Sequence, residues 1–151
     1  MQFEPDIIVT SADPTEVALV VEVKQRLSQP AFAERQMKRY MLGMRCPLGL
    51  LVTPDRMWLL RDRFRSDSED SIERVGEFST PGSLRSHVKD KEASGFELEQ
   101  AVQNWLKALG RGSTTETLDP KLREALEEYV VPALAQGVIR AGGPRILTGS
   151  R

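Results

Sequence analysis

The apolar run at residues 18–24, with the sequence ALVVEVK, constrains the fold more than any other segment. Its high content of β-branched residues predicts a buried strand. Side chains alternate between the two faces of a strand, so Glu22 and Lys24 share one face. The opposite face carries Leu19, Val21 and Val23. Two opposite charges on one face of a buried strand indicate either a structural ion pair where the strand reaches solvent or a functional site.

A second acid opens the first apolar segment of the chain. Asp6 precedes Ile7-Ile8-Val9, which we interpret as the hairpin partner of residues 17–24, because the residues between them are typical of a loop. Two acids and a lysine at the mouth of a sheet are the groups that metal-assisted phosphodiester hydrolysis requires. The carboxylates hold a hard divalent cation, and the lysine balances the charge that develops on the phosphate.

A helix is predicted over residues 30–43, because proline at its start suits a first helical turn. Its apolar stripe consists of Ala33, Met37, Met41 and Met44. Gln36 and Tyr40, four residues apart, lie with Phe32 on an adjoining face. Taken alone, these two residues are best explained as a solvated glutamine and a half-buried tyrosine.

In their order and spacing, Asp6, Glu22, Lys24, Gln36 and Tyr40 resemble the motif of the PD-(D/E)xK nuclease superfamily. The Gln-x-x-x-Tyr element is similar to the branch that contains RecB-type nucleases and the nuclease domains of type I restriction subunits. Residues 49–62, GLLVTPDRMWLLRD, are similar to the strand, turn and strand that follow the active-site helix in the restriction-subunit group. The resemblance covers residues 5 to about 65.

The resemblance implies a restriction-endonuclease-like fold and hydrolysis of DNA that depends on Mg²⁺ or Mn²⁺. Asp6, Glu22 and the backbone carbonyl of Val23 would be the metal ligands. Lys24 would be the catalytic lysine. Gln36 and Tyr40 would contact DNA or orient the site.

One departure from the superfamily concerns the start of the chain. Domains of this superfamily usually begin with a helix ahead of the strand that bears the aspartate, whereas only five residues precede Asp6 here. We therefore expect that helix to be absent from this sequence, replaced by a later helix, or supplied by another subunit. The apolar face of residues 17–24 needs cover in any case. The helix expected over residues 98–109, which contains Trp105, is the best candidate within the chain.

The remaining segments complete an α/β pattern. Further strands are expected at residues 48–53, 57–60 and, as an edge strand, 72–78. Residues 79–94 look irregular, and helices are expected at residues 98–109 and 120–131, with Pro132 kinking or ending the second. The expected fold is a mixed central sheet with flanking helices and a helical C-terminal third. The expected organisation is a nuclease-like core (1–94), a helical extension packed on it (95–137) and a flexible tail (138–151).

Charge is distributed unevenly along the chain, although the net charge is only −1. Residues 24–65 carry ten basic and three acidic residues, a net charge of +7, and the remainder carries −8. A basic strip beside the expected site is the footprint of phosphate-backbone binding. Its candidate DNA contacts are Arg26, Lys38, Arg39 and Arg45. The alternative is a solvated charged face, which is what most charge runs are.

Composition argues against several classes of protein. No apolar run approaches the roughly 20 residues of a membrane span, and the chain does not start with a basic and then apolar signal sequence. The single cysteine, Cys46, and the single histidine, His87, are too few for a thiolate–imidazole zinc site. His87 lies in a polar stretch, which argues against a Ser-His-Asp hydrolase. A chain without an internal disulfide fits the cytoplasm.

The best single account is a metal-dependent nuclease that hydrolyses DNA phosphodiester bonds in a restriction or repair setting, as a homodimer or within a larger assembly. Two alternatives stay open. One is a catalytically inactive module with the nuclease fold that binds DNA. The other is an interaction domain whose helical C-terminal third joins an assembly while the acids and the lysine are merely paired. Metal-dependent cleavage separates the first account from both alternatives, and salt-sensitive DNA binding without cleavage selects the inactive module.

Overall fold

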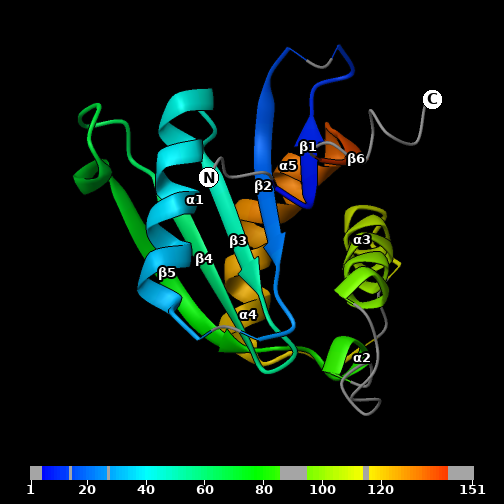
Figure 1. Cartoon of the computed structure of the whole chain (residues 1–151). Coiled ribbons are helices and arrows are strands. Elements are labelled where there is room, and N and C mark those ends of the chain that lie inside the picture. The colour runs from blue at the N-terminus through cyan, green and yellow to red at the C-terminus, as the bar shows by residue number, and fades with distance from the viewer. Residues whose placement is uncertain (1–4, 14, 27, 86–94, 114–115, 143–151) are drawn as a thin grey trace, which may run out of the picture.

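Within the described residues, six strands form one mixed sheet in the order β5-β4-β3-β2-β1-β6 (Figure 1). The computed structural model describes residues 5–13, 15–26, 28–85, 95–113 and 116–142. The strands are β1 (Ile7–Thr10), β2 (Val17–Val23), β3 (Leu48–Val52), β4 (Arg56–Asp62), β5 (Ile72–Ser79) and β6 (Val138–Ala141). The helical elements are α1 (Pro30–Met44), η1 (Glu69–Ser71), α2 (Gly82–Arg85), α3 (Gly95–Gly110), α4 (Pro120–Ala125), η3 (Leu126–Val130) and α5 (Val131–Ala135).

Strand direction fixes where the ends of α1 lie. Neighbouring strands are antiparallel except β2 and β3, which run parallel and are joined by α1. A parallel pair requires such a crossover, so the first turn of α1 lies near the C-terminal ends of β2 and β3. The five strands and the helix expected between residues 6 and 78 are confirmed, with small shifts at their ends. The chain is thus an α/β protein with a mixed sheet.

One face of the sheet is covered by α1, which contacts β2, β3 and β4 and lies in front of the sheet in Figure 1. Met37 and Met41 are fully buried in a core that also contains Val20 and Leu51. Gly49 of β3 lies directly beneath them: a Cβ at this position would be 2.7 Å from the Met37 Sδ and 2.8 Å from the Met41 Sδ. A Cβ at this position therefore fits only if the Met37 and Met41 side chains shift.

We expect Gly49→Ala to destabilise the protein by about 1–3 kcal/mol, because the added methyl group overpacks this contact. Gly43→Ala is the matched control. A Cβ at residue 43 would meet nothing within 4 Å, and alanine is favoured over glycine within a helix by about 1 kcal/mol. Urea unfolding of both variants measures the two effects, which should have opposite signs. Equal stability of the Gly49 variant and the wild type would contradict the packing described.

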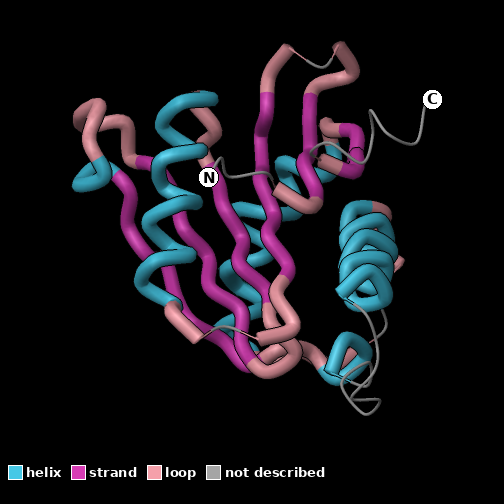
Figure 2. Tube along the Cα trace, in the orientation of Figure 1, coloured by secondary structure: helices cyan, strands magenta, loops and turns pink. Residues whose placement is uncertain are grey.

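The opposite face of the sheet carries the larger core, and Figure 2 shows helices on both sides of the strands. α3 contacts β2, and its Val102 and Trp105 belong to the same buried core as Leu19, Val21 and Val23. The expectation that the helix at residues 98–109 covers this face is therefore confirmed. The cover comes from the same chain.

Two expectations for the irregular parts of the chain are wrong. Residues 79–94 were expected to lack structure, but residues 82–85 form the short helix α2, with Leu84 buried. The expected flexible tail begins with a strand: β6 pairs antiparallel with β1, from Val138 opposite Thr10 to Ala141 opposite Ile7. Residues 86–94, which include His87, and residues 143–151 lie outside the described part of the chain.

Pro132 was expected to kink or end the helix that starts at Pro120, but helical structure continues past it. A π-helical turn, η3, precedes Pro132, and α5 continues the helix to Ala135. Proline has no N–H to donate and crowds the preceding turn, and a widened turn provides for both. No helix among the described residues is long and apolar enough to cross a membrane.

Candidate active site

Asp6 is anchored at the start of β1 by the backbone of β2. Its N–H donates to the carbonyl of Val21 at 3.2 Å, and its Oδ2 accepts the N–H of Val23 at 2.7 Å. Because Ile7 pairs with Val21, the antiparallel register places Asp6 across from Glu22. Residues that lie opposite each other in a sheet present their side chains on the same face. Both carboxylates therefore lie on the face covered by α1.

Glu22 is a buried acid, with only 5% of the residue exposed. Its Oε2 lies 3.4 Å from the Lys24 Nζ, whereas its Oε1 is buried and has no hydrogen-bond partner within the described part of the chain. Burial raises the pKa of Glu22 from 4.5 to about 8, and a hydrogen bond to Asp6 and the charge of Asp6 act in the same direction. Lys24 lowers it. The hydrogen bond between Glu22 and Asp6 shows that the two carboxylates lie side by side.

Lys24 connects the acid pair with solvent. Its backbone N–H donates to the carbonyl of Val52 at 2.9 Å, which extends the pairing of β2 with β3 by one residue. Its side chain is 44% exposed, so the ammonium group contacts the buried Glu22 while it remains accessible from outside. Asp6, Glu22 and Lys24 thus form one continuous group at the end of the hairpin.

Gln36 and Tyr40 lie on the same side of the sheet as the acids. Glu34 and Lys38, on one flank of α1, reach toward Arg74 of β5. With about 100° per residue, positions 36 and 40 lie about 160° and about 120° around the helix from Glu34, on the flank toward β2 and β1. Both side chains are half-buried. The structure brings the first three motif residues into contact and places the other two on the helix above them.

Cys46 lies beneath this helix and has no part in the chemistry. Its thiol is fully buried and donates to the carbonyl of Leu48 at 3.2 Å. Burial raises the pKa of Cys46 to about 12, so the thiol is neutral and unreactive at physiological pH. Burial also raises the pKa of Tyr40, and the nearby Cys46 adds to this shift.

The basic strip expected beside the site is divided in the structure. Lys38 binds Glu34 at 3.3 Å, and Arg39 lies 3.6 Å from Glu69. Arg45 caps the C-terminal end of α1, where it lines a cavity of about 520 Å³ with Val17 and neighbouring residues, at the opposite end of β2 from Glu22. Arg26 is exposed and lies two residues after Lys24. Of the four candidate DNA contacts, Lys38 and Arg39 are thus ion-paired, and Arg45 lies away from the acids.

The acid pair fits a divalent cation of the Mg²⁺ type. Among the described residues no group of three or more His, Cys, Asp or Glu side chains could hold a metal. Mg²⁺ does not need such a group, because it retains several waters and binds proteins through one or two carboxylates together with substrate phosphates. The unpartnered, buried Oε1 of Glu22 is an oxygen of the kind such a cation binds.

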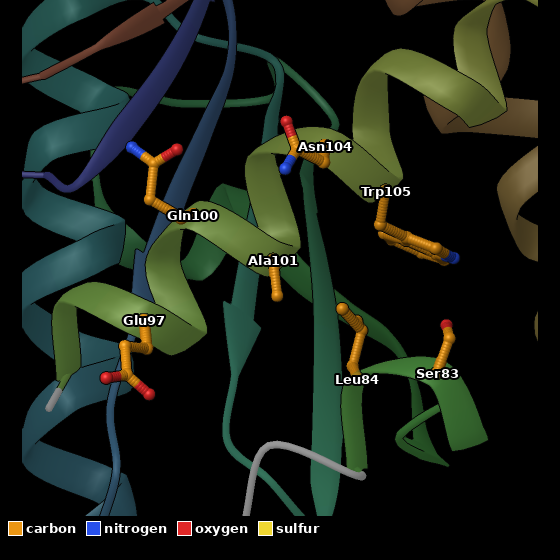
Figure 3. A pocket seen from close by; sticks show the side chains of 7 residues that line it. All are labelled: Ser83, Leu84, Glu97, Gln100, Ala101, Asn104 and Trp105. Carbon is orange, nitrogen blue, oxygen red and sulfur yellow. The ribbon is translucent and has the colours of Figure 1, made fainter. Parts of the chain in front are cut away.

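The sequence patterns did not indicate the pocket shown in Figure 3, which lies on the other side of the sheet. It has a volume of about 520 Å³ and is lined by Ser83, Leu84, Glu97, Gln100, Ala101, Asn104 and Trp105. The Trp105 Nε1 is buried and has no hydrogen-bond partner among the described residues. In the sequence, Trp105 is part of an apolar helical stripe, which gives no signal of a pocket. Among the described residues that line this pocket, Glu97 is the only charged one.

No protein-family model matches the chain, and searches of curated proteins and of solved structures gave no significant match.

The raised pKa of Glu22 predicts that the metal-free protein loses stability as the pH rises. Between pH 4.5 and about 8, the folded protein holds a proton that the unfolded chain has released. The stabilisation is therefore complete below the lower pKa and is lost as the pH passes the upper one. Glu22→Gln stays neutral, so it should raise the free energy of unfolding on the order of a few kcal/mol at about pH 9 and little at about pH 5.

Urea unfolding in EDTA at the two pH values measures this difference. Glu124→Gln, at an exposed position of α4, is the control and should have no effect at either pH. A Glu22→Gln effect that does not depend on pH would contradict a Glu22 pKa raised to about 8.

Proposed function

We propose that the chain is a divalent-cation-dependent nuclease that hydrolyses DNA phosphodiester bonds and is related to the PD-(D/E)xK superfamily. The observation that carries the proposal is the buried Glu22, held against a second acid and a lysine with one carboxylate oxygen unpartnered. A purely structural ion pair needs neither Asp6 nor an unpartnered oxygen. Holding a buried carboxylate against a second, half-buried one is costly in the absence of a cation, and such a pair is the arrangement expected of a metal site.

Each residue of the group has a role in the proposed hydrolysis. Asp6 and Glu22 would hold the cation through carboxylate oxygens, with the carbonyl of Val23 as a further ligand. A bound divalent cation polarises the scissile phosphate and makes a water more acidic. Lys24 would hold the attacking water and balance the negative charge that grows as the water oxygen bonds to phosphorus and the bond to the leaving oxygen breaks. Gln36 and Tyr40 would orient the substrate from α1.

The proposed relationship requires an explanation for the helix that precedes the aspartate-bearing strand in the superfamily. We infer that α3 takes its place, because α3 packs on the apolar face of β2 within the same chain. On the far side of the hairpin, β6 pairs antiparallel with β1, the strand that follows Asp6. We propose that the arrangement is a permuted version of the superfamily core, with α3 as the cover of the apolar face of β2.

A cleavage assay tests this function. Purified protein is incubated with end-labelled single-stranded DNA, duplex DNA and RNA, in Mg²⁺, in Mn²⁺ and in EDTA, and the products are resolved by length. The proposal predicts cleavage of DNA in Mg²⁺ or Mn²⁺ and none in EDTA. Absence of cleavage from every substrate in both metals would overturn it in favour of a structural pair of Glu22 and Lys24.

A further inference from the structure

An exposed aromatic ring lies beside the candidate site. Phe32, in the first turn of α1, has 56% of its surface exposed, although burial of a phenylalanine side chain is normally favourable. The first turn of α1 lies near the C-terminal ends of β2 and β3, and Glu22 is the last but one residue of β2. Phe32 therefore lies at the same end of the sheet as Glu22.

Phe32 also lies on the same flank of α1 as the two motif residues of the helix. Phe32, Gln36 and Tyr40 follow one another at intervals of four residues, which places them along one flank of α1. That flank faces β2 and β1, because the opposite flank holds Glu34 against Arg74 of β5. The exposed ring is thus the outermost member of the row that contains the two motif residues of the helix.

The charges nearby are not those of a duplex-binding surface. Glu34 pairs with both Lys38 and Arg74, and Arg39 lies beside Glu69. The arginines of β4 and of the residue after it are held by glutamates of β5. Within the described ranges, the exposed Arg26 and Arg35 make no ion pair, and both lie close in sequence to the site. Two arginines without an ion-pair partner could bind the phosphates of a single strand, whereas strong duplex binding commonly uses six or more phosphate contacts.

On these grounds we propose that the substrate is single-stranded DNA, with Phe32 stacking on an unpaired base beside the scissile phosphate. Stacking on an aromatic side chain needs an exposed base face, which a duplex does not offer. The phosphates on either side of that base would contact Arg26 and Arg35. This inference rests on the proposed nuclease function for the position of the scissile bond, but the stacking contact itself does not require cleavage.

Binding measured without cleavage tests the proposal. Fluorescence anisotropy in EDTA compares a labelled single strand of about 12 nucleotides with its duplex and with RNA of the same sequence. The wild type should bind single-stranded DNA most tightly, and Phe32→Ala should weaken this binding about ten-fold. Phe64→Ala is the matched control, because Phe64 is also exposed (62%) but follows β4 at a distance from the acids in sequence. It should bind as the wild type does.

A second readout distinguishes stacking from a structural role. Phe32→Trp should retain binding, and its indole fluorescence should be quenched by single-stranded DNA and not by the duplex. The inference is overturned if Phe32→Ala and Phe64→Ala bind equally, if duplex or RNA binds better than single-stranded DNA, or if Phe32→Ala changes the oligomeric state. If the wild type cleaves DNA but Phe32→Ala binds normally, only this inference fails. If Phe32→Ala loses binding but no DNA is cleaved, only the nuclease function fails.

Discussion

Replacement of Lys24 by alanine is expected to lower the rate of Mg²⁺-dependent DNA cleavage by about 10²–10³-fold, the usual effect of removing a group that stabilises developing transition-state charge. The Lys24 Nζ lies 3.4 Å from Glu22 and is partly exposed, so it is placed to contact both the acid pair and an incoming phosphate. Folding and most of the DNA binding should persist, because the side chain takes no part in the core. Single-turnover cleavage rates, with circular dichroism as the measure of folding, give the result.

Lys38→Ala is the matched control for this variant. Lys38 also pairs with a glutamate, Glu34 at 3.3 Å, but it lies on the flank of α1 toward β5. Its loss should leave the cleavage rate within about two-fold, since a surface ion pair contributes little to stability and none to this chemistry. A Lys24→Ala protein that cleaves at the wild-type rate would return Lys24 to the role of a structural ion-pair partner.

Asp6→Asn is expected to reduce cleavage by more than about 100-fold and to abolish stabilisation by Mg²⁺. Replacing a residue that only supports a metal ligand lowers metal affinity or activity about 10–100-fold, and Asp6 is proposed as a ligand itself. In the wild type, Mg²⁺ at about 100 times its Kd should stabilise the fold by about 2.7 kcal/mol. Asparagine keeps an oxygen that can accept the N–H of Val23, so the hairpin should remain intact. Thermal unfolding with and without Mg²⁺ measures the loss.

The control for this variant is Asp55→Asn. Asp55 is an exposed aspartate in the turn between β3 and β4, where its backbone carbonyl, not its side chain, accepts the N–H of Thr80. The cleavage rate of Asp55→Asn, and the stabilisation of its fold by Mg²⁺, should equal those of the wild type. Retention of the Mg²⁺ shift in Asp6→Asn would remove Asp6 from the metal site.

The sequence predicted the parts of the fold that follow from local pattern. β2 and α1 were predicted because a dense β-branched run and an apolar helical stripe are strong signals over seven or more residues. β6 has only four residues and no periodic pattern, and its position depends on pairing with β1, more than 120 residues earlier in the chain. Met44 was expected in the apolar stripe of α1 but is exposed, since it is the last residue of the helix. Pairing and helix ends are determined by the tertiary structure.

The same limit applies to the candidate site. The spacing of Glu22 and Lys24 predicts their shared face, and the hairpin predicts that Asp6 joins them. The basic strip was inferred from residues 24–65 alone, but Glu69, Glu73 and Glu77, which pair with several of its arginines, lie outside that segment. A count of charges along the chain does not include partners that the sheet brings together. The exposure of Phe32 likewise depends on which residues cover α1.

Soaking crystals of the protein in Mn²⁺ and locating the metal by its anomalous scattering is the most direct test of the central claim. The account predicts one strong peak between Asp6 and Glu22, about 2.0–2.6 Å from a carboxylate oxygen of each. The Lys24 ammonium should remain within reach of the same site. A fully soaked crystal without a peak there, with Glu22 still paired to Lys24 and hydrogen-bonded to Asp6, would contradict the account.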